Sequence, residues 1–328
     1  MIKNLGQWVL IALWGIVLTA CATAAIAPAI QVQALPEAIT VPYRISSEGR
    51  FIVDVAVNDS GSLPFALDTG ATVSTIYDDT AKAIGLNVSD DTILIRGLIA
   101  SGKRPAIKNV AFQIGSKSFP LKHIALLEVQ KINDEAAGLL GTDILGDHTA
   151  LFNKDTMIAT FVPSKYIEPK TFQGWRRIKL KTQIDSYPDS RLHFTEVKLD
   201  RTTANVLIDT GANSNFINWR LATLDKSIRQ MERTLRKEGR LQGALDSTAL
   251  KTQTTFYDLS LGEHYWKDVT VIVRELNTLS NIAPVDEPIM IAGANMFSPR
   301  TVAFDLGGST IYIRPNPDDP RPPPNIRP

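Results

Sequence analysis

The stretch ALDTGAT, residues 66–72, decides the fold, because it returns almost unchanged as LIDTGAN at residues 207–213. In each copy an aspartate, Asp68 or Asp209, follows an apolar strand-like run and precedes Thr-Gly, where glycine permits a sharp turn. A single aspartate at the end of a strand is most often a turn former. Two copies with the same apolar lead-in and the same trailing alanine indicate a duplicated unit instead.

The similarity between the two halves extends well beyond this motif. Each aspartate is preceded by strand-like runs and a polar turn, with the runs at residues 39–45, 51–57 and 64–67, then 178–184, 192–199 and 204–208. A later pair of strings also matches, LLGTDIL at residues 139–145 and IAGANMF at residues 291–297. Closing β segments follow both strings, at residues 156–162 and 310–313. The sequence therefore predicts two homologous, mainly β lobes related by a pseudo-two-fold axis.

Helical segments are expected within both lobes. Residues 78–84 predict a short helix that ends at Gly85. In the second half, an apolar stripe with steps of four and three predicts one longer helix, through Ile217, Leu221, Leu224, Ile228, Met231 and Leu235. Its other face is charged as far as Arg236, Lys237 and Glu238. We interpret it as a solvated face with local ion pairs, with a basic patch facing substrate or membrane as the alternative.

Composition sets broad limits on function. The chain has 328 residues, of which 44% are hydrophobic, enough for two lobes with a core each. The formal net charge of +1 gives no reason to expect nucleic acid as a partner. The four histidines are scattered without metal-ligand spacing, and no phosphate loop or serine nucleophile motif is present. The sequence predicts neither a metal nor a cofactor.

The N-terminus predicts a targeting segment. Lys3 precedes an apolar run at residues 8–18, and the following Leu-Thr-Ala-Cys resembles a bacterial lipobox with Cys21 as the lipidated residue. Cys21 is the only cysteine, so a disulfide within the chain is impossible. The alternatives are ordinary cleavage after Ala34, or an uncleaved anchor extending to Ile30. All three place the body outside the cytoplasm, in the periplasm, tethered to the outer membrane, secreted, or anchored in a membrane.

The resulting domain organisation has four parts. Residues 1–36 are a signal segment and tether, residues 37–163 the first lobe, and residues 164–314 the second lobe, which begins within a junction at residues 163–175. Residues 315–328 form a proline-rich tail that has little to bury and is expected to be disordered. A proline-motif ligand is the alternative for this tail.

The duplicated aspartate suggests a definite chemistry. Residues at equivalent turns near a pseudo-two-fold axis meet across it. Two carboxylates a few ångströms apart cannot both ionise cheaply, so they share one proton. One can then act as a base and the other as an acid, which would activate a water for amide hydrolysis without a covalent intermediate or a metal.

Aspartic proteases are the usual example of such a pair, and residues 40–314 resemble the retropepsin type of this family with both lobes fused in one polypeptide. LDTGA and IDTGA match its catalytic loop. LLGTDIL and IAGANMF resemble its second signature, which is two apolar residues, glycine, any residue, and aspartate or asparagine. The resemblance implies two closed β-barrel lobes.

The resemblance also implies residue roles. Asp68 and Asp209 would be the catalytic dyad, and Thr69 and Thr210 would hydrogen-bond across the lobe interface. The other residues of the two loops, and those packed behind the dyad, would be Gly70, Ala71, Gly211, Ala212, Leu140, Gly141, Ala292 and Gly293. Substrate-covering β-hairpin flaps would lie at residues 95–102 and 239–244.

Some positions depart from the family pattern. Thr142 and Ala294 stand where viral relatives often carry arginine, and Ala292 is smaller than the usual apolar residue. Ala71 and Ala212 stand where pepsin-like relatives have serine or threonine, whose hydroxyl favours the charged carboxylate. We therefore expect a dyad that titrates higher than that of pepsin and works at milder acidity.

The sequence thus predicts a monomeric aspartic endopeptidase that binds protein or peptide substrate extended in a cleft between its lobes. Two alternatives remain open on the sequence alone. One is a binding module for peptides or proteins that has the same fold and no turnover. The other is a protease specialised for a single partner protein. A membrane tether through Cys21 is compatible with each of them.

Overall fold

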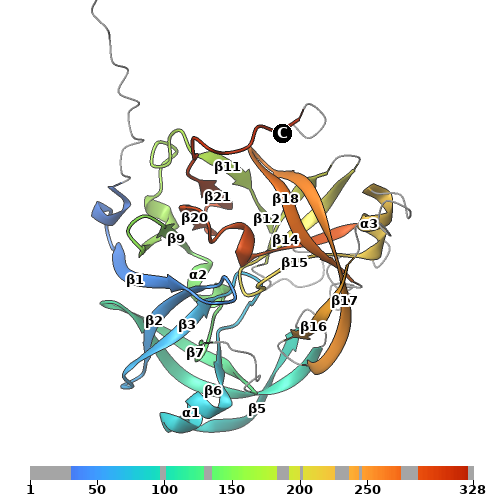
Figure 1. The fold of residues 1–328 in the computed structure, drawn as a ribbon. Helices are drawn as coiled ribbons and strands as arrows, with labels where there is room; N and C mark the ends of the chain where they lie inside the picture. Colours follow the sequence, from blue (N-terminus) through green and yellow to red (C-terminus); the bar gives the residue numbers. More distant parts are fainter. Residues whose placement is uncertain are drawn as a thin grey trace, which may run out of the picture.

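The computed structural model describes residues 31–96, 101–128, 135–182, 192–199, 202–225, 236–243, 246–274 and 287–323. These residues form two mainly β lobes, each closing into a barrel, with a few short helices (Figure 1). The predicted fold class is therefore confirmed. None of the helices in these segments is long and apolar enough to cross a membrane.

The first lobe begins with the 3₁₀ turn η1 (Gln31–Ala34), and η2 (Ser164–Tyr166) follows its last strand. Its helices are α1 (Asp78–Ala83) and α2 (Thr142–Leu145). Its strands are β1 (Ile39–Ile45), β2 (Phe51–Val57), β3 (Ser62–Leu67), β4 (Thr75–Tyr77), β5 (Val88–Arg96), β6 (Ser101–Ile114), β7 (Lys117–Leu127), β8 (Gly138–Leu140), β9 (His148–Asn153) and β10 (Ile158–Pro163). Alternating buried and exposed residues in β1 explain why it forms an antiparallel strand with one face on the core.

The second lobe repeats this order. Its strands are β11 (Arg176–Lys179), β12 (Lys181–Thr182), β13 (His193–Lys198), β14 (Thr203–Asp209), β15 (Asn215–Ile217), β16 (Arg236–Gly243), β17 (Asp246–Leu261), β18 (His264–Val273), β19 (Ile289–Gly293), β20 (Val302–Asp305) and β21 (Thr310–Ile313). Its helices are α3 (Trp219–Asp225) and the 3₁₀ turn η4 (Ala294–Met296). In both lobes the strand that leads to the repeated aspartate pairs in parallel with the strand of the second signature, β3 with β8 and β14 with β19.

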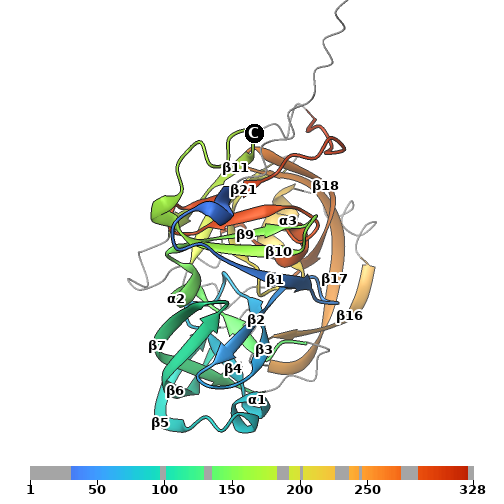
Figure 2. The same ribbon diagram turned by 90° about the vertical axis from the view of Figure 1, so that its left-hand side faces the viewer.

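A shared sheet joins the two lobes. Its strands run in the order β11-β21-β20-β9-β10-β1, which reads the same from either end when each strand is replaced by its counterpart in the other lobe. The pseudo-two-fold axis therefore passes between β20 and β9, where Val302 pairs with Phe152. In Figure 2, β10 lies directly above β1, and β9 lies next to β10.

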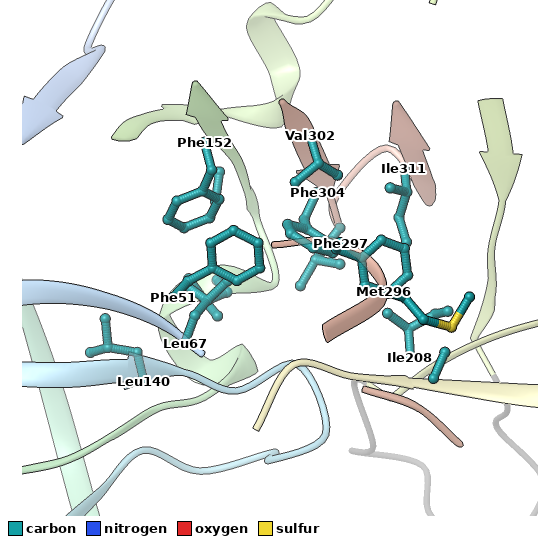
Figure 3. Close-up of a cluster of buried hydrophobic side chains, with 14 of the residues drawn as sticks. Phe51, Leu67, Leu140, Phe152, Ile208, Met296, Phe297, Val302, Phe304 and Ile311 are labelled. Atoms are coloured by element: carbon teal, nitrogen blue, oxygen red, sulfur yellow. The ribbon is translucent and has the colours of Figure 1, made fainter. Parts of the chain in front are cut away.

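One hydrophobic core is continuous through both lobes. Phe51 and Phe152 of the first lobe have ring centroids 4.4 Å apart, and Phe51 lies 5.8 Å from Phe304 of the second lobe. Phe297 continues the cluster at 5.4 Å from Phe304 (Figure 3). Because aromatic side chains from both lobes interlock, this packing fixes the lobes against each other at the base of the repeated loops.

The second-lobe helix differs from the prediction. It begins at Trp219, because Ile217 ends strand β15, and it is described as far as Asp225. The predicted continuation at residues 226–235 lies outside the described residues. The charged residues expected on its solvated face, Arg236, Lys237 and Glu238, lie in strand β16 and pair with β17. At these residues, backbone hydrogen bonds to the long neighbouring strand β17 determine the conformation, although the spacing of the side chains favours a helix.

The tail also differs from the expectation of disorder, at least as far as Pro323. The side chain of Asp319 is only 1% exposed and forms ion pairs with Arg176, at 3.2 Å, and with Arg300. The backbone N–H of Asn316 donates to the same carboxylate at 3.0 Å. Proline lowers the number of backbone donors, but one buried carboxylate between two arginines is enough to anchor the segment. Residues 324–328 lie outside the described residues.

Candidate active site

The repeated aspartates lie at equivalent places in the two lobes. Asp68 directly follows β3, and its N–H donates to the carbonyl of Leu140 on β8 at 2.9 Å. Asp209 is the last residue of β14 and pairs with Gly293 on β19. Each aspartate is thus held from behind by a main-chain contact with the strand of the second signature.

Thr69 and Thr210 tie the two loops together across the lobe interface. Each hydroxyl donates to a backbone carbonyl of the other lobe, Thr69 Oγ1 to Ile208 at 2.8 Å and Thr210 Oγ1 to Leu67 at 2.9 Å. Each hydroxyl also accepts the N–H of the opposite threonine at 3.1 Å. Both side chains are fully buried, so these four hydrogen bonds are shielded from water and fix the spacing of the loops.

The loop glycines are required by a close approach across the interface. A Cβ on Gly70 would lie 2.5 Å from Cγ of Asp209, and a Cβ on Gly211 would lie 2.3 Å from Cγ of Asp68. Neither glycine has a positive φ. The clash that a side chain would cause, rather than a strained dihedral, is therefore the reason for glycine at both positions. Each glycine faces the carboxylate of the opposite lobe.

Behind each loop lies a polar residue that sequence reasoning missed. The hydroxyl of Ser74 accepts the N–H of Gly141 at 2.9 Å, and the amide oxygen of Asn215 accepts the N–H of Gly293 at the same distance. Ser74 also donates its N–H and its hydroxyl to the carboxylate of Asp143, at 2.8 and 2.6 Å. The only signal for these two residues in the sequence is a short polar residue six positions after each repeated aspartate.

The remaining loop residues pack as a unit. The carbonyl of Ala71 accepts the N–H of Thr142 at 2.8 Å, and the carbonyl of Ala212 accepts the N–H of Ala294 at 2.8 Å. Ala292, smaller than the family pattern, is completely buried in the shared core. The two second-signature strings therefore support both loops through main-chain hydrogen bonds, which tolerate the side-chain departures at Thr142 and Ala294.

The two carboxyl groups lie in different hydrogen-bond environments. Asp68 accepts one backbone N–H, from Gly70 at 2.9 Å. Asp209 accepts two, from Gly211 at 3.0 Å and from Ala212 at 3.1 Å. More donors stabilise the charged form of Asp209, so this asymmetry favours the neutral, protonated form at Asp68.

The pKa directions follow this asymmetry. Burial raises the pKa of Asp68 well above its usual value, and the negative charge of Asp209 raises it further. Burial also raises the pKa of Asp209, but the hydrogen bonds from Ala212, from the Asp68 carboxyl and from Gly211 oppose that rise. The positive charge of Arg50 lowers the pKa of both groups. Both pKa directions therefore favour the protonated form at Asp68 over the protonated form at Asp209.

The hairpins expected as flaps are present in part. Ile95 pairs with Gly102 at the end of the β5–β6 hairpin, and residues 97–100 at its tip lie outside the described residues. Gly243 pairs with Asp246 at the end of the β16–β17 hairpin, with residues 244–245 likewise outside. Both candidate segments are therefore hairpin ends, and their role in covering substrate stays a prediction.

Within the described segments, no group of three or more histidine, cysteine, aspartate or glutamate side chains is arranged to hold a metal ion. Cys21, the candidate lipidation residue, lies outside the described residues.

Comparisons with known proteins agree with this architecture. The chain has the fold of a two-lobed aspartic proteinase, since it superposes on the crystal structure of the aspartic proteinase from Irpex lacteus with a TM-score of 0.51. The match covers 84% of this chain and 96% of that one at 12% sequence identity, so it bears on the fold alone. The model of a family described as aspartyl protease matches residues 53–144, within the first lobe, which confirms the resemblance to retropepsin-like aspartyl proteases there. No curated protein sequence matches the chain.

Proposed function

We propose that the protein is an aspartic endopeptidase that hydrolyses peptide bonds with Asp68 and Asp209 as its dyad. The observation that carries the proposal is the mutual approach of the two loops, in which each glycine lies against the carboxyl group of the opposite lobe. The threonine hydrogen bonds make this approach rigid. A duplicated turn former would need neither a buried carboxyl pair nor bracing from both lobes.

The hydrogen-bond asymmetry suggests the role of each aspartate. The Asp209 carboxylate, which accepts two backbone N–H groups, takes a proton from a water molecule as it attacks the carbonyl carbon of the scissile bond. Asp68 gives its proton to the carbonyl oxygen, and a neutral tetrahedral intermediate forms. Asp209 then returns a proton to the amide nitrogen while Asp68 takes one back from a hydroxyl, so the C–N bond breaks and the dyad is restored. No covalent enzyme intermediate is required.

The proposed substrate is a protein or peptide bound in an extended form between the lobes, with the β5–β6 and β16–β17 hairpins covering it. Extended peptides bind through main-chain hydrogen bonds to strand edges, which both hairpins offer. We propose a monomer, because both aspartates are supplied by one chain. Nucleic acid has no place in this proposal.

Cleavage of a denatured protein mixture tests the proposal. The purified protein should cleave it, and Asp68→Asn and Asp209→Asn should each abolish the cleavage. Asp54→Asn, which changes an exposed aspartate of β2, is the matched control and should leave it intact. Cleavage that persists in both dyad variants would contradict the assignment. Binding of peptides without cleavage at any pH would favour a binding module, and cleavage of one protein alone would favour a specialised protease.

For location, we propose an extracytoplasmic protein of bacterial origin, tethered through a lipidated Cys21. The support is the sequence Leu-Thr-Ala-Cys placed directly after an apolar run. Metabolic labelling with a fatty acid should mark the full chain produced in a bacterial host, and Cys21→Ser should remove the label. Label that stays after Cys21→Ser would contradict lipidation at this residue, and a soluble unlabelled protein would favour ordinary cleavage.

A further inference from the structure

The segment before the first strand is part of the folded lobe junction. At the end of η1 (Gln31–Ala34), the dark blue turn before β1 in Figure 1, the N–H of Leu35 donates to the carbonyl of Val32 at 3.1 Å. A second turn follows, in which the N–H of Ala38 donates to the carbonyl of Leu35 at 3.2 Å. Val32 is 0% exposed. A residue this close to a targeting segment would be solvated if it belonged only to a tether.

Val32 belongs to an apolar cluster built from both lobes and from the segment that joins them. Its other buried members are Leu151 of β9, Val162 of β10, Phe172 and Trp175 of the joining segment, and Ala303 of β20. Leu35 and Ala38 pack against the same cluster. Because β9 and β20 meet at the pseudo-two-fold axis, the N-terminal segment packs over the junction of the lobes rather than over one lobe.

Glu37 fixes the same segment through polar contacts. Its carboxylate accepts the hydroxyl of Tyr166 at 2.8 Å and lies 3.1 Å from Lys165 and 3.4 Å from Lys117. The Tyr166 hydrogen bond, followed by Lys165, lowers the pKa of Glu37 to about 2. These exposed contacts add little stability each, but they come from both β7 and η2 and so define one position for the segment.

We infer that the mature protein keeps residues 32–38, and that any removal of the N-terminal targeting segment cuts before Val32. The sequence offers a competing site after Ala34, where Val-Gln-Ala precedes Leu35. A chain cut there would lack η1 and with it Val32. The N–H of Leu35 would lose its hydrogen bond to the carbonyl of Val32. An exported chain loses its leader before it folds, so this loss would leave an apolar gap at the lobe junction. The inference is independent of the proposed catalytic function.

The intact mass of the mature protein tests this directly. The full chain, produced in a bacterial host and purified from both membrane and soluble fractions, should begin at or before Val32. Ala34→Arg should mature at the same place, because the proposed cut does not use Ala34. A mature chain that begins after Val32, or maturation that fails in Ala34→Arg, would overturn the inference.

A second measurement tests the packing itself. Val32→Asp should lower the melting temperature by several degrees, whereas Gln33→Asp, its exposed neighbour, should leave it unchanged. If Val32→Asp does not fold, Val32→Ala should give a smaller loss of the same kind. Equal melting temperatures for the Val32 and Gln33 variants would contradict a structural role for the segment.

Discussion

Replacement of Thr69 by valine removes one hydroxyl and leaves the side-chain shape almost unchanged. In the structure that hydroxyl donates to the carbonyl of Ile208 at 2.8 Å and accepts the N–H of Thr210 at 3.1 Å. Thr69 and Thr210 are fully buried, so water cannot replace the lost partner. A buried polar group left without its hydrogen bond costs about 1–3 kcal/mol, so the two groups left unpaired, the Ile208 carbonyl and the Thr210 N–H, predict a loss of about 2–6 kcal/mol in the free energy of unfolding.

Urea unfolding at neutral pH measures this loss. Thr69→Ser keeps the hydroxyl and should recover most of the stability, whereas Thr40→Val, on the exposed face of β1, should change it by no more than about 0.5 kcal/mol. A Thr69→Val variant as stable as Thr40→Val would refute the reasoning that these hydrogen bonds hold the loops together. The same conclusion would follow if serine failed to restore stability.

Three further predictions concern the carboxyl pair. Gly211→Ala places a Cβ 2.3 Å from Cγ of Asp68, so peptide cleavage should fall by about 10²-fold or more, with the loss mainly in kcat; unchanged cleavage would contradict the close approach. Arg50→Gln removes the charge that lowers the pKa of both aspartates, so both limbs of the pH–rate profile should move to higher pH, while Arg44→Gln should leave them in place. The pKa of Asp68 is raised above its unfolded value of 3.8, so its burial costs stability as pH rises through the folded pKa. Asp68→Asn should therefore be more stable than the natural chain at neutral pH and no more stable below pH 3.8, as followed by urea unfolding; a stability gain that is the same at both pH values would exclude this linkage.

Much of the fold could be predicted because its signals are local. Alternating apolar residues and turn residues located β1 at residues 39–45 and β21 at residues 310–313 with the bounds that the structure has. The duplication of ALDTGAT predicted two lobes and the pseudo-two-fold axis, which the strand order of the joining sheet displays. The repetition is informative because the same pattern of strands and turns occurs twice in the sequence, once in each lobe.

The second-lobe helix could not be predicted correctly from its side-chain spacing. The spacing of apolar residues continues to Leu235, but Arg236 to Gly243 form a strand because β17 offers them a backbone partner. For the tail, the sequence predicted too little structure rather than too much. Its composition predicts disorder, yet Asp319 forms ion pairs with Arg176 and with Arg300, which lie in earlier parts of the chain. Both errors arise from contacts that no local pattern encodes.

The candidate site shows the same limit. Asp68 and Asp209 were found from the motif, but their unequal hydrogen bonds were not, since the two loops have the same Asp-Thr-Gly-Ala sequence. The contact of Ser74 with Asp143 spans 69 residues and is likewise invisible in the motif. Arg50 lies in the turn between β1 and β2, and only the folded chain brings its charge near the dyad.

The pH dependence of peptide cleavage tests the central claim most directly, because it reports whether the two aspartates share one proton. We predict a bell-shaped profile of kcat/KM with two limbs and an optimum clearly above pH 2, lost in Asp68→Asn and in Asp209→Asn. An optimum near pH 2, roughly where the lower pKa of the pepsin pair lies, would contradict the expectation of milder acidity. Cleavage with an unchanged profile in either asparagine variant would contradict the dyad itself.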